Sequence, residues 1–183
     1  NSISHFTTDP QVIAHPPSSA EAFLTLADLQ REGKIRHIGV SNFGVRQLQE
    51  VLDLGVRIAV NELPYNLLMR AIEAEIAPFC RTHGIGIIGY MTLMQGVLGG
   101  AFTSFDQVPP MRLRTRHFHP QRPGSRHGEP GFEPETWNTL QAIREIAAET
   151  RLPVSDVAIA WALGNPDIGC VLAGCRTRAQ LEE

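Results

Sequence analysis

Polar and aromatic side chains stand at the ends of several short β-favouring runs in this sequence. In chain order they are His5, Ser41-Asn42, Glu62 ahead of Tyr65-Asn66, Tyr90, and Gly174-Cys175-Arg176. Hydroxyl, amide, carboxylate and imidazole groups exchange hydrogen bonds with small ligands, and a guanidinium group binds phosphate. In parallel α/β folds, ligands bind where the carboxyl ends of the strands converge. The pattern therefore favours a ligand site at that edge, although the ordinary polarity of loops would account for part of it.

The elements that would position these groups alternate along the chain. A helix is predicted over 18–33, with Ser18 and Glu21 as a capping box and Gly33 as its stop. Strands are expected at 2–5, 35–40, 58–60, 85–90 and 168–173, and further helices around 48–52, 71–83, 140–147 and 154–161, with a last one leading to the end of the sequence. This alternation predicts an α/β fold with a parallel sheet of five strands and right-handed crossovers.

Composition narrows the class of protein. The 183 residues carry a formal net charge of −3, with 43% apolar and 19% charged residues, which indicates one globular domain, 1–183. The sequence has no excess of basic residues that would favour binding to nucleic acids or membranes. No apolar run approaches the 18 residues that a membrane-spanning helix needs. Three cysteines without CxxC spacing favour a reducing, cytoplasmic compartment. Because the chain opens at Asn1 and is shorter than the roughly 250 residues of a closed (β/α)₈ barrel, we expect a piece of a longer protein.

A long segment, 92–132, is rich in proline, glycine, arginine and histidine and has no helical or strand periodicity. Loops of this length are usually functional or mobile, so it is a candidate lid. Within 111–130 it carries Arg112, Arg114, Arg116, Arg122 and Arg126 against one acid, Glu129. A phosphate clamp over a cofactor and a solvated loop are both open interpretations. Metal binding through His117, His119 and His127 and nucleic-acid binding are weaker ones, since no ligand spacing matches a known motif.

The run Gly84-Ile85-Gly86-Ile87-Ile88-Gly89 satisfies the G-x-G-x-x-G dinucleotide pattern but lies in the wrong context. That fingerprint follows a strand and opens a helix. Here the glycines follow a predicted helix and fall inside a predicted strand. We expect them to permit close packing of the sheet.

Several motifs together resemble the aldo-keto reductases. They are Gly33-Lys34-Ile35-Arg36, Ile38-Gly39-Val40-Ser41-Asn42-Phe43, Leu63-Pro64-Tyr65-Asn66-Leu67-Leu68, Gln95-Gly96-Val97-Leu98, and Gly174 with Arg176 and Gln180-Leu181. The resemblance runs from about His5 to the last residue. It implies a (β/α)₈ TIM barrel of which this sequence holds only about strands 4 to 8, with 92–132 as the long loop after the seventh strand. It further implies NADPH-dependent reduction of an aldehyde or ketone, a small-molecule carbonyl substrate.

The resemblance assigns one catalytic residue to this sequence. His5 falls where the family has the histidine of its Asp, Tyr, Lys and His tetrad, while the other three members are absent. Hydride attack on a carbonyl needs a positioned acid and oriented donors for the developing alkoxide. Lys34 is the chain's only lysine, and no sequence feature places it beside Tyr65 or Tyr90. We therefore expect the 183-residue chain to be inactive by itself.

The resemblance also assigns a site for NADPH or NADP⁺. Ser41, Asn42 and Glu62 would lie at the nicotinamide carboxamide, Tyr90 would stack on the ring, Leu93, Gln95 and Gly96 would follow the cofactor, and Gly174, Arg176, Gln180 and Glu183 would hold its adenosine 2′-phosphate end. The sequence departs from the family pattern at three places: Glu62 replaces the usual glutamine, Met91-Thr92 replaces the usual Ser-Pro, and Ala101 replaces a frequent lysine. The pyrophosphate would therefore have to be bound by backbone amides or by arginines of the long loop.

Two rivals to an enzyme remain open. The chain could be a non-catalytic NADPH-binding sensor or regulatory module on the same barrel, or a degenerate scaffold that keeps only the fold. An open sheet also leaves two edges and an uncovered face, which favours pairing with another copy, so a homo-oligomer is possible.

Overall fold

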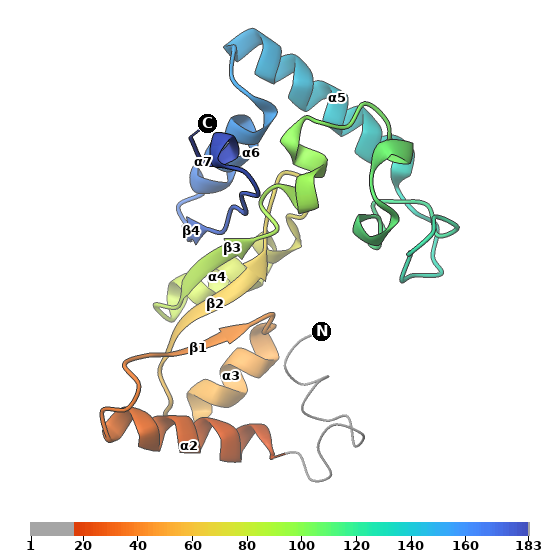
Figure 1. Cartoon of the computed structure of the whole chain (residues 1–183). Coiled ribbons are helices and arrows are strands. Elements are labelled where there is room, and N and C mark those ends of the chain that lie inside the picture. The colour runs from red at the N-terminus through yellow and green to blue at the C-terminus, as the bar shows by residue number, and fades with distance from the viewer. Residues whose placement is uncertain (1–16, 183) are drawn as a thin grey trace. The chain divides into compact units, whose positions relative to one another are not determined.

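The computed structural model describes residues 17–182 (Figure 1). Its helices are α2 (Ser19–Arg31), α3 (Val45–Asp53), α4 (Ile76–Thr82), α5 (Glu133–Thr150), α6 (Val154–Leu163) and α7 (Arg178–Glu182), and its strands are β1 (Ile38–Ser41), β2 (Ile58–Pro64), β3 (Gly86–Tyr90) and β4 (Ile168–Val171). The fifth expected strand, 2–5, lies outside the described residues. Within 17–182 no helix is long and apolar enough to cross a membrane.

The chain divides into two compact units. Unit 1 comprises the chain up to Pro64, Arg70–Tyr90 and Asn165–Cys170. Unit 2 comprises Tyr65–Met69, Met91–Gly164 and the chain from Val171 onward. Expected site residues fall in both units: Ser41, Asn42, Glu62 and Tyr90 in unit 1, and Leu93, Gln95, Gly96, Gly174, Arg176 and Gln180 in unit 2.

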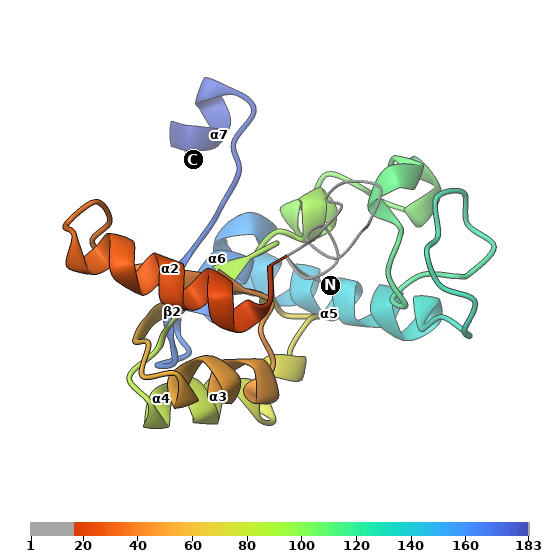
Figure 2. The ribbon, with the colours of Figure 1, turned by 90° about the horizontal axis from the view of Figure 1, so that it is seen from below.

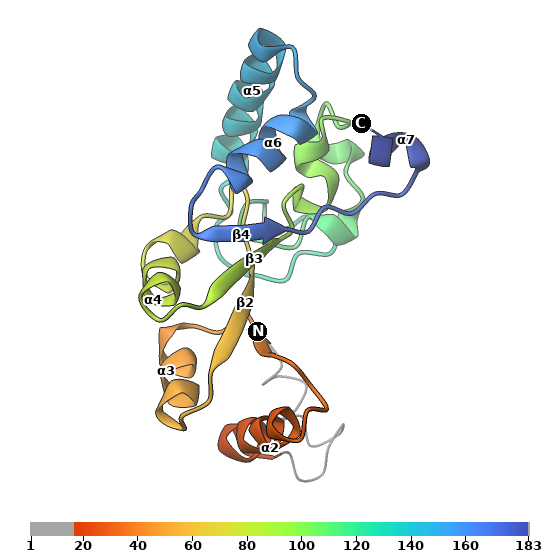
Figure 3. The same ribbon diagram turned by 90° about the vertical axis from the view of Figure 1, so that its left-hand side faces the viewer.

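Unit 1 is built on the parallel sheet that the alternating pattern predicts. The strand order is β1-β2-β3-β4, and β1 to β3 pair in parallel, with a register shift between Ile38 and Gly39. Helices α3 and α4 lie on the same side of the sheet (Figures 2 and 3). Ile38, Leu48, Val51 and Ile58 are buried in the core of this unit. A core of this kind holds the carboxyl ends of β1 to β3 at one edge.

The first helix confirms its predicted start signal. The Ser18 hydroxyl accepts the backbone N–H of Glu21 at 3.2 Å, and the Glu21 carboxylate accepts the backbone N–H of Ser18 at 2.8 Å. Gly33 follows the end of α2 with a φ of +73°, a conformation that favours glycine. The capping box and the glycine together fix both ends of this helix.

The single helix predicted over 71–83 is wrong, because the chain forms a 3₁₀ turn, η1 (Ala71–Glu73), and then a separate α4. Glu75 interrupts the helical backbone with φ −135°. Pro78 lies in the first turn of α4, where its missing N–H costs nothing, whereas a helix continuous from Ala71 would place it in the interior. The glycine-rich run 84–89 follows α4 and lies largely within β3, as its sequence context predicts.

Unit 2 packs α5 and α6 against the long segment 92–132. This segment contains the 3₁₀ helices η2 (Met94–Gly99), η3 (Phe105–Gln107) and η4 (Pro110–Arg112) and is otherwise irregular. Its buried side chains form one hydrophobic cluster with Leu140 and Ile143 of α5 and Ala158 of α6; they are Met94, Val97, Leu98, Phe105, Val108, Leu113 and Phe118. The segment therefore contributes much of the core of this unit.

Candidate functional site

Four of the expected residues in unit 1 meet at the carboxyl ends of β1 to β3. The Tyr90 hydroxyl donates to Asn42 Oδ1 at 2.9 Å, and Asn42 Nδ2 donates to Ser41 Oγ at 3.0 Å. Ser41 Oγ in turn donates to the backbone carbonyl of Glu62 at 3.1 Å. Three neighbouring strands therefore place an amide, a hydroxyl and a phenol in one continuous hydrogen-bonded chain.

The backbone at Asn42 supports this arrangement. Asn42 has a φ of +60°, and its N–H donates to the Glu62 carbonyl at 2.9 Å. Asparagine tolerates the left-handed region better than most residues, so a turn here does not require glycine. We call the group Ser41, Asn42, Glu62 and Tyr90 the strand-end cluster.

The strand-end cluster keeps unused hydrogen-bonding capacity. The Asn42 amide has two N–H groups and gives one to Ser41. Among the described residues the Glu62 carboxylate has no hydrogen-bond or ion-pair partner. A free donor and a free acceptor on adjacent strands can bind a group that itself offers both, such as a primary amide.

A second group of expected residues lines one cavity of about 700 Å³ inside unit 2. The predicted residues on its wall are Leu93, Gln95, Gly96, Gly174, Arg176 and Gln180. They come from the start of the long segment and from the chain after β4, which are about 80 positions apart in the sequence. The Gln180 side chain accepts the backbone N–H of Arg176 at 2.9 Å, which closes the turn that carries Arg176.

The chain beside this cavity adopts an unusual backbone conformation. Met91, Met94 and Gln95 have φ values of +56°, +45° and +55°. Such conformations cost residues with a Cβ atom about 1 kcal/mol or more each and cluster at functional sites. Gly96, with φ +95°, continues this path, and a Cβ atom on it would lie 3.2 Å from the Arg112 guanidinium. The strain supports a binding role for this wall.

The arginines of the long segment divide into two groups. We call residues 111–132 the arginine segment. Arg112 and Arg114 line the cavity, where Arg112 donates to the Gln95 carbonyl at 3.0 Å and Arg114 to the Met111 carbonyl. Arg116 instead pairs with Glu129 at 2.7 Å. Part of the positive charge of the arginine segment is therefore neutralised within the segment itself, by Glu129.

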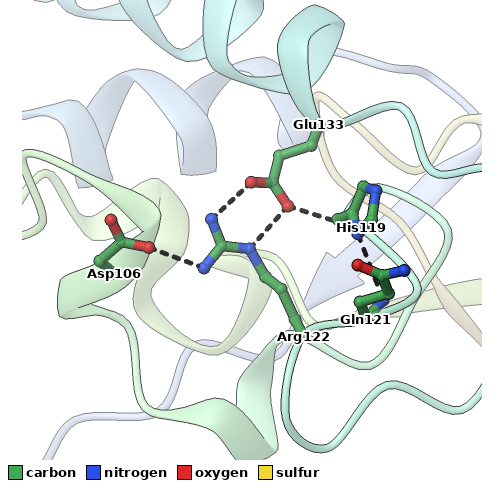
Figure 4. A network of polar contacts seen from close by, with 5 residues as sticks. All are labelled: Asp106, His119, Gln121, Arg122 and Glu133. Carbon is green, nitrogen blue, oxygen red and sulfur yellow. Dashed lines mark hydrogen bonds and ion pairs between the residues drawn. The ribbon is translucent and has the colours of Figure 1, made fainter.

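Arg122 is fully engaged away from the cavity (Figure 4). Its guanidinium group binds the Glu133 carboxylate through two hydrogen bonds, of 2.6 and 2.5 Å, and Asp106 through a third of 2.9 Å. Glu133 also accepts the backbone N–H of His119 at 2.7 Å. The hydrogen bonds from Arg122 hold the pKa of Glu133 below its ordinary value, and Glu133 raises the pKa of Arg122.

Sequence reasoning missed one wall of the cavity. Ser155, Asp156 and Ile159, all on α6, line it. Asp156 lies in the first turn of α6. Carboxylates are common at this position because they interact favourably with the helix dipole, so the sequence gives no reason to assign Asp156 to a binding site. The residues that line the cavity thus include three arginines, Arg112, Arg114 and Arg176, and one acid, Asp156.

The histidines of the arginine segment have individual partners. His117 uses both ring nitrogens, one with the Leu68 carbonyl at 2.9 Å and one with Thr115 at 3.0 Å. Within 17–182 no three histidine, cysteine, aspartate or glutamate side chains gather as a metal site would require. The expected site residues His5 and Glu183 lie outside the described residues.

Comparison with known proteins adds to this geometry. The aldo/keto reductase family matches residues 5–183 of the chain. An NADH-specific methylglyoxal reductase of Escherichia coli K12 is 30% identical over 168 residues, which are 90% of this chain and 47% of that protein. The aldo-keto reductase YhdN of Bacillus subtilis is 29% identical over 162 residues, 86% of this chain and 45% of its own. The chain spans about half the length of the curated relatives it matches.

The fold is similar to that of solved structures as well. A glycerol dehydrogenase from Gluconobacter oxydans superposes with a TM-score of 0.70 and 25% identity, over 90% of this chain and 49% of that one. A probable voltage-gated potassium channel subunit beta of rice is also similar in sequence, 24% identical over 79% of this chain and 44% of its own. Similarity thus extends to proteins named for quite different roles.

Proposed function

This chain belongs to the aldo/keto reductase family, and we propose that it carries the nicotinamide dinucleotide site of an oxidoreductase that reduces an aldehyde or ketone. The observation that carries the proposal is the cavity of unit 2, whose wall combines six residues expected at a dinucleotide with two further arginines. When bound, the reduced dinucleotide supplies the hydride. The residues of this chain bind and orient it.

The strand-end cluster suits the nicotinamide carboxamide. A carboxamide offers one carbonyl acceptor and two N–H donors. The free N–H of Asn42 would meet the carbonyl, and the Glu62 carboxylate would accept from the amide. Glutamate in place of the family's usual glutamine is therefore compatible with the site, because the required group there is an acceptor. Tyr90, fixed by its hydrogen bond to Asn42, would present its ring face to the nicotinamide.

The cavity of unit 2 suits the phosphate groups. Arg112 and Arg114 each retain N–H groups beyond the one given to a backbone carbonyl, so both can bind pyrophosphate oxygens. Arg176 would bind the adenosine 2′-phosphate, which favours NADPH over NADH. One relative is named as NADH-specific, so NADPH and NADH binding are compared directly.

The experiment is a fluorescence titration of the purified chain with NADPH and, separately, NADH. Arg176→Ala should weaken NADPH binding about tenfold or more and NADH binding much less, because only NADPH carries the phosphate that Arg176 would bind. Arg178→Ala is the matched control, since Arg178 is exposed and pairs with Glu182 at 2.6 Å outside the cavity wall. Equal losses for both dinucleotides would refute the 2′-phosphate assignment, and a wild-type chain that binds neither would refute the site.

A second candidate function is dinucleotide binding without turnover, and the two tyrosines favour it for this chain alone. Tyr65 is buried and stacks on Trp161, and the Tyr90 hydroxyl is bonded to Asn42. Lys34, the only lysine, pairs with Glu32 at 2.6 Å. None of these residues forms the tyrosine and lysine pair that would protonate an alkoxide, and His5 is the one tetrad residue expected here. Steady NADPH oxidation by the 183-residue chain with a reactive aldehyde would contradict this inactivity.

A further inference from the structure

Arg122 joins three separate parts of unit 2. Its side chain is 20% exposed and binds Asp106 in η3 and Glu133 at the first position of α5, while Glu133 also holds the backbone of His119 (Figure 4). The guanidinium group further lies 5.7 Å from the centroid of the Phe105 ring. All three kinds of nitrogen in the group are used, Nε and Nη2 by Glu133 and Nη1 by Asp106.

The chain on either side of Arg122 is doubled back on itself. The backbone N–H of Arg126 donates to the Arg114 carbonyl at 3.2 Å, and that of Phe132 to the Arg116 carbonyl at 2.9 Å. Just before these two pairs, Gly124, with φ +87°, passes so close to Pro110 that a Cβ atom would lie 2.8 Å from its carbonyl oxygen. The return half of the arginine segment therefore fixes the backbone of the half that carries Arg114.

Arg122 itself is not a ligand for the phosphates. It does not line the cavity, and two carboxylates already compensate its charge. Its neighbours at the start of the segment, Arg112 and Arg114, do line the cavity. Their side chains are long and lose much rotamer freedom when they bind a phosphate, so a fixed backbone beneath them lowers the cost of binding.

We infer that Arg122 is a positioning residue for dinucleotide binding, which fixes the arginine segment through Glu133 and Asp106 so that Arg112 and Arg114 face the pyrophosphate. The inference rests on the proposed function. Lysine cannot replace Arg122 in this role, because the three hydrogen bonds require the planar fork of a guanidinium group.

The test measures NADPH affinity by fluorescence titration for Arg122→Gln, for the double variant Arg112→Ala with Arg114→Ala, and for the triple variant. Arg122→Gln should weaken binding about fivefold to tenfold in the wild-type background and less than twofold in the double variant, since the residues through which it acts are then absent. Arg122→Lys should resemble Arg122→Gln. Arg116→Gln, which breaks an exposed pair in the same segment, should leave the affinity unchanged.

Hydrogen exchange of the peptide covering 108–118 gives an independent readout, and Arg122→Gln should accelerate it. Asp106→Asn, which weakens one of the three bonds, replaces Arg122→Gln if that variant does not fold, with an expected loss of about twofold that again vanishes in the double variant. An effect of equal size in both backgrounds would overturn the positioning role and indicate a purely structural one. If Arg122→Gln bound NADPH as tightly as the wild type, the positioning role alone would be refuted. If the wild-type chain bound no dinucleotide, the proposed function itself would be refuted.

Discussion

Phe118→Ala tests whether the long segment 92–132 is part of the folded core of unit 2. Phe118 is completely buried, and its ring meets that of Phe105 edge-on at 5.2 Å between centroids and 86° between planes. Burial of such a ring contributes up to about 3 kcal/mol, and an aromatic pair of this geometry adds about 0.5 to 1.5 kcal/mol. We expect the variant to lose about 3 to 5 kcal/mol of stability, the range typical of a buried phenylalanine truncated to alanine.

The assay is urea denaturation followed by circular dichroism and by tryptophan fluorescence, since Trp137 packs against Phe105 at 5.0 Å and reports on unit 2. Phe132→Ala serves as the control. Phe132 lies in the same segment but is 51% exposed, with Arg116 at 5.5 Å from its ring, so its loss should stay below about 1 kcal/mol. If the two variants lost the same small amount, the segment would not belong to the core, and the argument that it holds the cavity arginines in place would fail with it.

Two further predictions concern unit 1 and the free thiols. Arg81 binds Asp167 in a bidentate pair that lowers the pKa of Asp167. The pair therefore stabilises the fold at pH values above the ordinary aspartate pKa, and this stabilisation is lost as pH falls through the lowered pKa. The urea midpoints of wild type and Asp167→Asn should differ at pH 7 and converge in acid, and a difference that stays constant with pH would contradict the assignment. Burial raises the pKa of the Cys80 thiol, whereas Cys170 and Cys175 are exposed. A thiol reagent at pH 8 should therefore label Cys170 and Cys175 quickly and Cys80 only when the protein unfolds. Fast labelling of all three thiols would show that the core around Cys80 is open.

Local signals in the sequence were sufficient where a single chemical group decides the structure. Ser18 and Glu21 define the start of α2, and the placement of Gly86 and Gly89 in β3 follows from the helix before them. The split of the predicted 71–83 helix was also readable in principle, because Pro78 cannot donate a hydrogen bond inside a continuous helix. The apolar spacing of 71–83 predicts one continuous helix only if this proline is disregarded.

Long-range packing was beyond the reach of local patterns. Phe105, Val108, Leu113 and Phe118 show no helical or strand period, since they enter the core from a short 3₁₀ turn and irregular backbone. Local patterns also do not reveal ion pairs between residues far apart in the sequence. Nothing local distinguishes Arg122 from Arg112, yet Arg122 binds Glu133 at the start of α5 whereas Arg112 lines the cavity. The strand-end residues were predictable because parallel strands bring their ends together whatever the loops do.

The left-handed residues beside the cavity limit how far this protein can be made more heat-resistant without harm. Glycine at position 95 would relieve a backbone conformation that glutamine adopts at a cost, so a search for thermostable variants would tend to select Gln95→Gly. The same change would remove a cavity side chain and loosen the carbonyl that holds Arg112 at 3.0 Å. At this turn, tolerance of heat and the proposed binding of an anionic dinucleotide are therefore opposed properties, and a variant improved in one is expected to decline in the other.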